Sequence, residues 1–407
     1  MIKKERMMLR RLVYLKKLFD FKDKPFIKVV TGIRRCGKST LLKMFIDEIQ
    51  GQGAPSDNIL QMNFEDLKYD GMNYRALNDY VLSRLPQSGK FYVFLDEIQR
   101  VPQWEKTVNS LFLNEQIDLY LTGSNAWLLS SELSTYLSGR SVEIKMLPLS
   151  FKEFQEFYSF PTNKSRQEIF SDYVRFGGMP SLAECGFDET QVRQVLDGIY
   201  NTVLMKDVLA RNDVRDVSVL QELVSFLADN VGNITSVNKI TQVLVSEKSL
   251  SSQNNKLIEK YVSLLENAFV FYRASRYDIK GKDYLRNLEK YYIVDSGLKN
   301  HLVSKVTDTG RILENIVYLE LLRRDYKVGV GKVDDKEVDF VAMKGNDKKY
   351  FQVCESFSEE ATRNRELRPL QSIKDSFEKI VLTLDSLYAG ITDDGIKIVN
   401  LIDWLEE

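Results

Sequence analysis

The chain has 407 residues, of which 43% are hydrophobic and 28% are charged, and its formal net charge is −1. This globular composition predicts roughly two to four packed domains, and the balanced charge excludes a basic surface spread over the whole molecule. Three well-separated cysteines and a single histidine, His301, argue against a disulfide framework, a histidine-rich zinc site and a Ser-His-Asp hydrolase.

No apolar run approaches the ~20 residues of a membrane-spanning helix, and no signal peptide is visible. The sequence therefore predicts a cytoplasmic protein without a membrane partner. Residues 1–19 are rich in lysine and arginine and place leucines on one helical face. We expect this amphipathic helix to pack on the domain that follows, with nucleic-acid contact as the alternative.

Residues 32–40 match the phosphate-binding pattern G-x-x-x-x-G-K-[ST]. An apolar, β-branched run at 26–31 precedes them, and residues 41–49 place apolar side chains at helical spacing. In such a strand–loop–helix arrangement, the loop N–H groups and the start of the helix converge on an anion. The sequence therefore predicts a nucleotide-phosphate site formed by Gly32, Arg35, Cys36, Gly37, Lys38, Ser39 and Thr40.

Two residues of this loop have expected chemical roles. Lys38 would reach the β- and γ-phosphates, and Ser39 would ligate Mg²⁺. Cys36 stands at a free position of the pattern and is expected only to be small enough to fit. Arg34 and Arg35 form a pair, and the sequence leaves open which of them reaches a phosphate.

The stretch 91–97 is an apolar run that ends in Asp96 and Glu97. An open parallel sheet binds its ligands at the C-terminal ends of its strands. Asp96 is therefore predicted to hold Mg²⁺, and Glu97 to orient and polarise an attacking water as a catalytic residue. A second acid beside the first favours water as the nucleophile over a protein or sugar hydroxyl.

A further predicted strand, 117–122, is followed by Ser124 and Asn125. A polar side chain there is placed to sense the γ-phosphate, and we prefer Ser124, although capping of the next helix would also explain both residues. Arg140 stands at a loop-to-strand junction. It could be an arginine finger for a neighbouring subunit's nucleotide, which would require a homo-oligomer, or it could form a structural ion pair.

Several of these motifs occur together in a fixed order, at residues 32–40, 95–99, 121–126, 137–140 and 148–154. In this the chain resembles the prokaryotic AAA-superfamily ATPases of the archaeal-ATPase type, relatives of the STAND signalling ATPases. In those proteins a C-terminal domain of unknown function, similar to the PD-(D/E)xK nuclease fold, follows the ATPase. The resemblance implies an α/β fold with an AAA-like P-loop parallel sheet, and ATP and Mg²⁺ as cofactors.

The resemblance also implies a helical lid in which a Gly-Gly-x-Pro turn lies near the adenine. Gly177, Gly178 and Pro180 match this turn and would contact the base. An ordinary turn between two helices is the alternative.

We expect four domains: an ATPase core (1–150), a helical lid (151–215), a winged helix-turn-helix (216–305) and a restriction-endonuclease-like α/β domain (306–407). The winged helix is predicted from helices at 217–229, 236–245 and 251–267 and strands at 268–273 and 290–294. Residues 271–290 interleave basic side chains with tyrosines, which could grip the backbone of double-stranded DNA. A packing or autoinhibitory module is the alternative.

In the last domain, helices are predicted at 310–324 and 365–376 and strands at 337–342, 350–355, 379–384 and 397–399. PD-(D/E)xK chemistry needs two acids to hold Mg²⁺ and a lysine to position water. Asp339 fits the first acid and Glu314 fits an acid on the helix. Gln352 stands where the second acid belongs and Cys354 where the lysine belongs, so we expect a nuclease-like fold without nuclease activity.

Together these observations predict an ATP-hydrolysing AAA-superfamily protein that couples Mg-ATP turnover to conformational change and engages DNA through its winged helix. One alternative is a STAND-like regulatory ATP switch that acts through protein interactions. A second alternative is an ATP-dependent nuclease, which Gln352 and Cys354 oppose.

Overall fold

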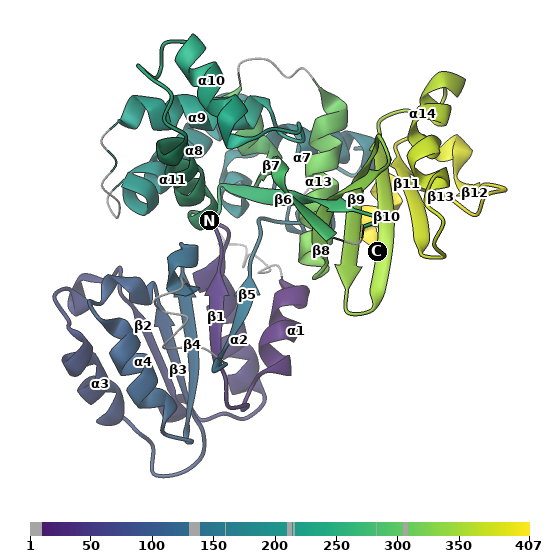
Figure 1. Cartoon of the computed structure of the whole chain (residues 1–407). Coiled ribbons are helices and arrows are strands. Elements are labelled where there is room, and N and C mark those ends of the chain that lie inside the picture. Colours follow the sequence, from purple (N-terminus) through teal and green to yellow (C-terminus); the bar gives the residue numbers. More distant parts are fainter. Residues whose placement is uncertain are drawn as a thin grey trace. The chain divides into compact units, whose positions relative to one another are not determined.

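Figure 1 shows a computed structural model of the chain, which describes residues 10–129, 139–158, 160–209, 214, 216–281, 283–303 and 308–407. The chain divides into two compact units, residues 1–146 with 267–269, and residues 147–266 with 270–407. No described helix is long and apolar enough to cross a membrane. The predicted segment 1–19 is described only from residue 10 onward.

The first unit is built on a parallel sheet with the strand order β2-β3-β4-β1-β5. The strands are β1 (Ile27–Thr31), β2 (Ile59–Asn63), β3 (Phe91–Asp96), β4 (Ile117–Gly123) and β5 (Ser141–Lys145). The three central strands, β3, β4 and β1, are buried along their whole length. Such strands read as continuous apolar runs because helices cover both faces of the sheet.

The helices of this unit are α1 (Leu12–Asp20), α2 (Lys38–Gly51), α3 (Tyr74–Leu82) and α4 (Trp104–Phe112). On one face, the Phe45 ring of α2 packs against Phe94 and Tyr120 of the sheet and against Phe19 of α1. On the other face, α3 and α4 bury their apolar side chains against Val93 of β3. Figure 1 shows these two helical layers on either side of the strands. The expected packing of the N-terminal helix on this domain is therefore confirmed for α1.

Short 3₁₀ turns complete the connections of the first unit. They are η1 (Ser56–Asn58), η2 (Leu67–Tyr69), η3 (Ile98–Arg100) and η4 (Ala126–Leu129). The turn η3 follows directly after β3, so it lies at the edge of the sheet where β3 ends.

A buried ion pair lies within the sheet and was not predicted from the sequence. Lys28 of β1 donates to Asp118 of β4, and neither side chain is more than 3% exposed. Asp118 also accepts hydrogen bonds from the Tyr120 hydroxyl at 2.7 Å and the Asp23 N–H at 3.1 Å. Burial lowers the pKa of Lys28, although the charge of Asp118 opposes this shift. The pair is therefore well satisfied, but each member depends on the other.

Asp118→Asn should lower the free energy of unfolding of this unit by about 3–5 kcal/mol, because it leaves the Lys28 ammonium buried without its counter-charge. Native-state hydrogen exchange of the β1 and β4 amides measures the change. The matched control is Glu48→Gln, which breaks a solvent-exposed pair with Arg10 and should cost less than about 1 kcal/mol. Equal losses in the two variants would contradict the prediction.

The second unit begins with α6 (Phe151–Phe157), α7 (Arg166–Phe176), η5 (Pro180–Cys185) and α8 (Glu189–Thr202), which continues as the π-helical turn η6 (Val203–Leu209). Ser150 and Ser165 each start a helix with a capping box, in which the serine and a glutamate satisfy the first free N–H groups. The helical segment that starts at Glu189 thus runs on to Leu209, with its last turn wider than an α-helix.

Three helices and a hairpin follow, as expected for residues 216–305. They are α9 (Val217–Asp229), α10 (Val237–Ser246), α11 (Asn255–Asn267), β6 (Phe271–Asp278) and β7 (Asp283–Ile293), and α12 (Ser296–Leu302) comes after them. The predicted strands, 268–273 and 290–294, cover only the open end of the hairpin, where β6 begins and β7 ends. The turn residues Asp278 and Asp283 face each other across it, so both strands run further into the polar stretch than apolar residues alone indicate.

The hairpin belongs to a larger sheet of the second unit. β6 pairs in parallel with β8 (Lys327–Val333), and the strand order is β12-β13-β11-β10-β9-β8-β6-β7. The remaining strands are β9 (Lys336–Lys344), β10 (Asp347–Cys354), β11 (Glu378–Thr383), β12 (Gly390–Ile391) and β13 (Lys397–Asn400). One continuous sheet therefore crosses residue 305, the boundary expected from the sequence.

Helices α13 (Thr309–Arg323), α14 (Glu360–Gln371) and α15 (Leu401–Glu406) accompany this sheet, with the 3₁₀ turn η7 (Ser386–Tyr388). The prediction of a helix at 310–324 is confirmed within one residue at each end. The predicted helix 365–376 was wrong by about five residues, since α14 starts at Glu360 without a side-chain cap to signal it. Strand β8 was missed: its two glycines, Gly329 and Gly331, weaken the strand pattern.

Candidate functional site

The loop between β1 and α2 depends on two glycines. Gly32 has a φ angle of 148°, and a β-carbon there would lie 2.2 Å from the carbonyl oxygen of Met146. Gly37 has a φ angle of 104° directly before α2. Residues with a side chain are disfavoured at such backbone angles, so the path of the loop backbone favours glycine at both positions of the motif.

Lys38 is the first residue of α2, and its side chain is 5% exposed. Its Nζ atom donates hydrogen bonds to the carbonyl oxygens of Gly32 at 2.9 Å and Ile33 at 3.1 Å. The same atom lies 4.0 Å from Glu97 Oε1. The loop thus holds the ammonium group beside the acid that follows β3. The N–H groups of the first helical turn, which includes Ser39 and Thr40, have no acceptor within the helix.

Asp96 ends β3 and is 1% exposed. Its Oδ1 atom accepts a hydrogen bond from the hydroxyl of Thr122, the residue at the same level of β4. Its Oδ2 atom is buried and has no hydrogen-bond partner among the described residues. A buried carboxylate oxygen without a donor fits a cation or a cation-bound water. Asp96 therefore fits the Mg²⁺ that the resemblance implies, while Ser39 stays a predicted ligand.

Glu97 has a left-handed backbone, with a φ angle of 55°. Its N–H donates to Thr122 Oγ1 at 2.9 Å, and its carboxylate accepts from the Gln99 side chain and from Ser124 Oγ at 3.4 Å. Non-glycine residues at such angles are uncommon and occur at sites where structure imposes them. Here the turn lets two consecutive acids, Asp96 and Glu97, serve one site. Ser124 thus lies beside the predicted water-orienting acid.

Thr122 was not predicted as a site residue, yet it contacts both acids. Thr122→Val keeps the shape of the side chain but removes the donor to Asp96 and the acceptor for the Glu97 N–H. We expect the Mg²⁺ concentration needed for half-maximal nucleotide turnover to rise by about 10–100-fold, as for other residues that orient a metal ligand. A magnesium titration of turnover measures this.

The control for this variant is Thr107→Val. Thr107 is also buried and donates to the Tyr74 carbonyl oxygen at 2.5 Å, so the substitution removes a similar hydrogen bond elsewhere in the unit. An equal shift in the magnesium requirement of both variants would show that the effect is not specific to Asp96 and Glu97.

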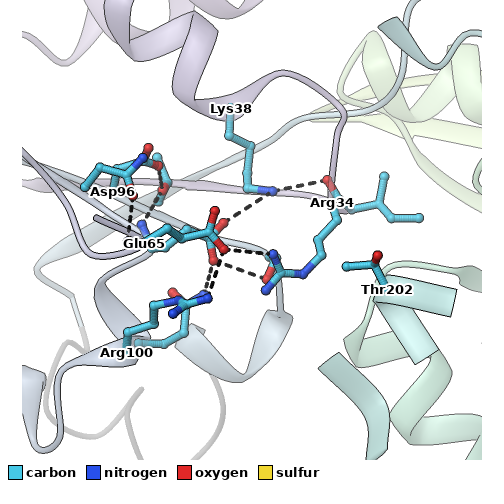
Figure 2. A network of polar contacts seen from close by, with 12 residues as sticks. Arg34, Lys38, Glu65, Asp96, Arg100 and Thr202 are labelled. Atoms are coloured by element: carbon cyan, nitrogen blue, oxygen red, sulfur yellow. Dashed lines mark hydrogen bonds and ion pairs between the residues drawn. The ribbon is translucent and has the colours of Figure 1, made fainter. Parts of the chain in front are cut away.

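Arg34 of the loop and Arg100 of η3 converge on one carboxylate oxygen, Glu65 Oε1 (Figure 2). The distances are 3.2 Å and 3.1 Å. Burial works to raise the pKa of Glu65, but the hydrogen bonds and charges of Arg34 and Arg100 outweigh it, so the pKa is lowered. Arg35, by contrast, is exposed. Of the two arginines in the loop, Arg34 is therefore the one that forms an ion pair with an acidic residue, Glu65.

Cys36 is fully buried inside the loop. Its N–H donates to the Ile33 carbonyl oxygen at 3.3 Å, and its own carbonyl oxygen accepts from Arg11 at 3.2 Å. Burial raises the pKa of its thiol, and the charges of Lys38 and Arg11 oppose that only in part. A raised pKa disfavours the reactive thiolate, so the side chain serves packing, as expected.

Arg140 lies at the end of the sheet where β1 and β5 begin, opposite the end that carries the phosphate-binding loop of the same chain. It precedes β5 (Ser141–Lys145), and Ser141 pairs with Ile27 at the start of β1, whereas the loop follows the end of β1. A five-residue strand spans about 17 Å. The guanidinium is exposed, 5.7 Å from the centre of the Phe112 ring, and no described carboxylate pairs with it. Within one chain it is therefore too far away to act on the nucleotide site.

The predicted base contacts Gly177, Gly178 and Pro180 lie in the second unit. The Gly178 N–H donates to Asp295 Oδ2 at 2.7 Å, and a β-carbon on Gly177 would lie 2.2 Å from Asp295 Oδ1. Burial raises the pKa of Asp295 to about 6, although N–H groups around it oppose the shift. Packing against Asp295 accounts for Gly177, and a β-carbon on Gly178 would lie 2.4 Å from the Leu149 carbonyl oxygen. Contact with an adenine stays a prediction.

The predicted nuclease-like residues come together in the second unit. The Asp339 N–H donates to Gln352 Oε1 at 3.3 Å, and Asp339 Oδ2 accepts from the Val353 N–H at 2.8 Å. Burial, together with the charge of Glu314, raises the pKa of Asp339. Burial also raises the pKa of Cys354 to about 12. A neutral thiol at this position cannot supply the cation that a lysine would.

Comparison with known families supports the account of the first unit. The family described as "AAA domain" matches residues 24–155, which include every strand of the parallel sheet. A second family, described as a domain of unknown function (DUF8612), matches residues 167–309, from α7 to the start of α13.

Two curated proteins are similar over nearly the whole chain. An uncharacterized protein of Haemophilus influenzae is 43% identical over 405 residues, covering 98% of each chain. An uncharacterized protein of Methanocaldococcus jannaschii is 29% identical over 393 residues, covering 93% of this chain and 85% of the other.

Among solved structures, a Walker-type ATPase of Pyrococcus abyssi is similar, with a TM-score of 0.46 and 18% identity over 72% of this chain and 95% of the other. The AMPPCP-bound DnaA of Aquifex aeolicus has a TM-score of 0.32 and 14% identity over 62% and 85%. At these scores neither likeness bears on function. The chain carries an AAA domain and belongs to the same protein family as the Haemophilus influenzae relative.

Proposed function

We propose that the first unit binds Mg-ATP and hydrolyses it. The observation that carries this proposal is the convergence of three motif residues from two separate segments. Lys38 lies 4.0 Å from Glu97, and Thr122 joins Glu97 to Asp96 through its hydroxyl. The match to the AAA domain family covers all three residues.

Each residue has a role that follows from its position. Lys38 neutralises negative charge on the β- and γ-phosphates, and the N–H groups of Gly37 and the first turn of α2 bind phosphate oxygens. Asp96 and Ser39 would hold Mg²⁺, which supplies charge neutralisation between the β- and γ-phosphates. Glu97 accepts a hydrogen bond from the attacking water and orients it. Ser124, 3.4 Å from Glu97, is the proposed γ-phosphate sensor.

We further propose that turnover is coupled to conformational change and to engagement of duplex DNA by the β6–β7 hairpin. Support for DNA contact comes from the basic residues and tyrosines of residues 271–290. Three of these basic residues are already paired: Arg273 with Glu266, Lys280 with Asp334, and Lys290 with Glu314. Phosphate contacts would therefore fall to the rest of the hairpin.

These ion pairs favour a second candidate function, a regulatory ATP switch that acts through protein interactions. A hairpin whose cations are paired internally keeps less positive charge for a phosphate backbone. The two functions predict different responses to DNA and to nucleotide.

The test measures ATP turnover with and without duplex DNA, at low and at high salt, and the molecular mass in the same conditions. Stimulation by DNA that disappears at high salt supports DNA engagement, because phosphate contacts weaken as salt rises. Turnover that ignores DNA, together with a mass that changes with ATP, would support the switch. Absence of turnover in every condition would contradict the proposal of an ATPase.

A further inference from the structure

Lys290 of β7 is a buried cation in the second unit. Its side chain is 4% exposed, and its Nζ atom lies 2.7 Å from Glu314 Oε1 of α13 and 2.7 Å from Glu337 Oε1 of β9. The three residues come from three elements that are distant in sequence but joined by the sheet and by α13. A lysine placed this deeply needs carboxylate partners, and here it has two.

Other donors of this chain also bind carboxylates of this cluster. Glu314 Oε1 accepts from the Tyr292 hydroxyl at 2.5 Å. Asp339 lies two residues after Glu337 on β9, so it shares the same face of that strand, and it accepts from the Val353 N–H at 2.8 Å. Glu314 and Asp339 therefore each accept a hydrogen bond from a donor other than Lys290.

These residues do not fit the divalent cation that a nuclease-like fold implies. Among the described residues, no three histidine, cysteine or acidic side chains are arranged to hold a metal ion. An ammonium group lies between Glu314 and Glu337, where a cation shared by these two carboxylates would have to lie. A metal ion there would be repelled by Lys290 and would have to displace it.

We propose that the Lys290 ammonium takes the place of a divalent cation among Glu314, Glu337 and Asp339, so that this cluster is a closed structural site. The lysine comes from the hairpin, whereas its partners come from α13 and β9. It thus joins the hairpin to the C-terminal part of the sheet. Residues that resemble a nuclease centre then serve to fix one part of the second unit to another.

The test compares Mn²⁺ binding to the full chain and to its variants without nucleotide, by electron paramagnetic resonance. Glu314→Gln should leave the Mn²⁺ stoichiometry of the wild-type chain unchanged. Lys290→Met should gain an additional bound Mn²⁺, because it removes the ammonium group and leaves the space between Glu314 and Glu337 without a cation. That gain should disappear in the double variant Lys290→Met/Glu314→Gln.

The matched control is Lys336→Met, which removes the same charge from a neighbouring lysine that pairs with Asp335 at 3.6 Å rather than with the cluster. It should gain no Mn²⁺. Native-state hydrogen exchange of the β7 and β9 amides reports on the folding of the second unit in each variant. A wild-type Mn²⁺ site that Glu314→Gln removes would overturn the proposal, and so would a folded Lys290→Met chain without the gain. Should Lys290→Met fail to fold, the comparison of the wild-type chain with Glu314→Gln still decides.

Discussion

Glu97→Gln should lower the rate of ATP turnover by about 10²–10⁴-fold, the usual contribution of a positioned general base. Glutamine has nearly the size of glutamate and can still contact Gln99 and Ser124. It accepts a proton far less readily than a carboxylate does. Lys38 and the loop are untouched, so ATP should still bind with nearly unchanged affinity. Steady-state phosphate release and equilibrium binding of ATP measure the two quantities.

The control for Glu97→Gln is Glu115→Gln, which makes the same chemical change at an exposed position two residues before β4. It should leave both turnover and binding unchanged. Turnover within a factor of about three of wild type in the Glu97 variant would remove this residue from the proposed mechanism.

Arg140→Ala should lower ATP turnover by about 10³–10⁵-fold if its guanidinium completes a neighbour's site, the effect known for arginine fingers. The reason is geometric: Arg140 is exposed at the edge of the sheet opposite its own loop. A finger role for Arg140 would therefore require the nucleotide of a neighbouring chain. A purely structural role, such as its contact with Phe112, predicts a change in stability with little change in turnover.

Mixing two inactive variants separates these roles. In a mixed oligomer, Lys38→Ala cannot bind ATP but still offers Arg140, whereas Arg140→Ala binds ATP but lacks the finger. Turnover should reappear on mixing, and only when the two chains associate. Two inactive variants that stay inactive in a mixed oligomer would contradict a finger supplied between subunits. Arg140→Lys serves as a further control, because a lysine keeps the charge but not the planar fork of donors.

Short motifs could be predicted from sequence because each is complete within a few residues. The loop glycines Gly32 and Gly37 fit only one backbone path, and the strand that ends in Asp96 is a continuous apolar run. Parallel strands bring their C-terminal ends to one edge. The meeting of Lys38, Asp96 and Glu97 therefore followed from the order of strands and loops alone.

Other site residues could not be found in this way, because their partners are far apart in the chain. Thr122 looks like any polar residue at the end of a strand until the register of β3 and β4 places it beside Asp96. Glu65 binds Arg34 and Arg100 from a loop after β2. A polar residue at the end of the strand that neighbours the acidic strand is the one signal that could have indicated Thr122.

Lys290 shows the opposite error, in which a local pattern suggests the wrong surroundings. In sequence it belongs to a run of basic residues and tyrosines, a pattern typical of an exposed surface that contacts phosphates. In the fold it is buried between Glu314 and Glu337. The charge of a side chain is known from sequence, but whether it faces solvent depends on elements that contact it from 24 or more residues away, here α13 and β9.

The most direct test of ATP hydrolysis by this chain is release of inorganic phosphate from Mg-ATP by the wild-type chain and by Lys38→Ala, together with ATP affinity. We expect steady turnover by the wild-type chain, and loss of both turnover and tight binding in the variant, since Lys38 is the cation held beside Glu97 at 4.0 Å. Equal phosphate release by the two chains would contradict it, as would a wild-type chain that does not bind ATP.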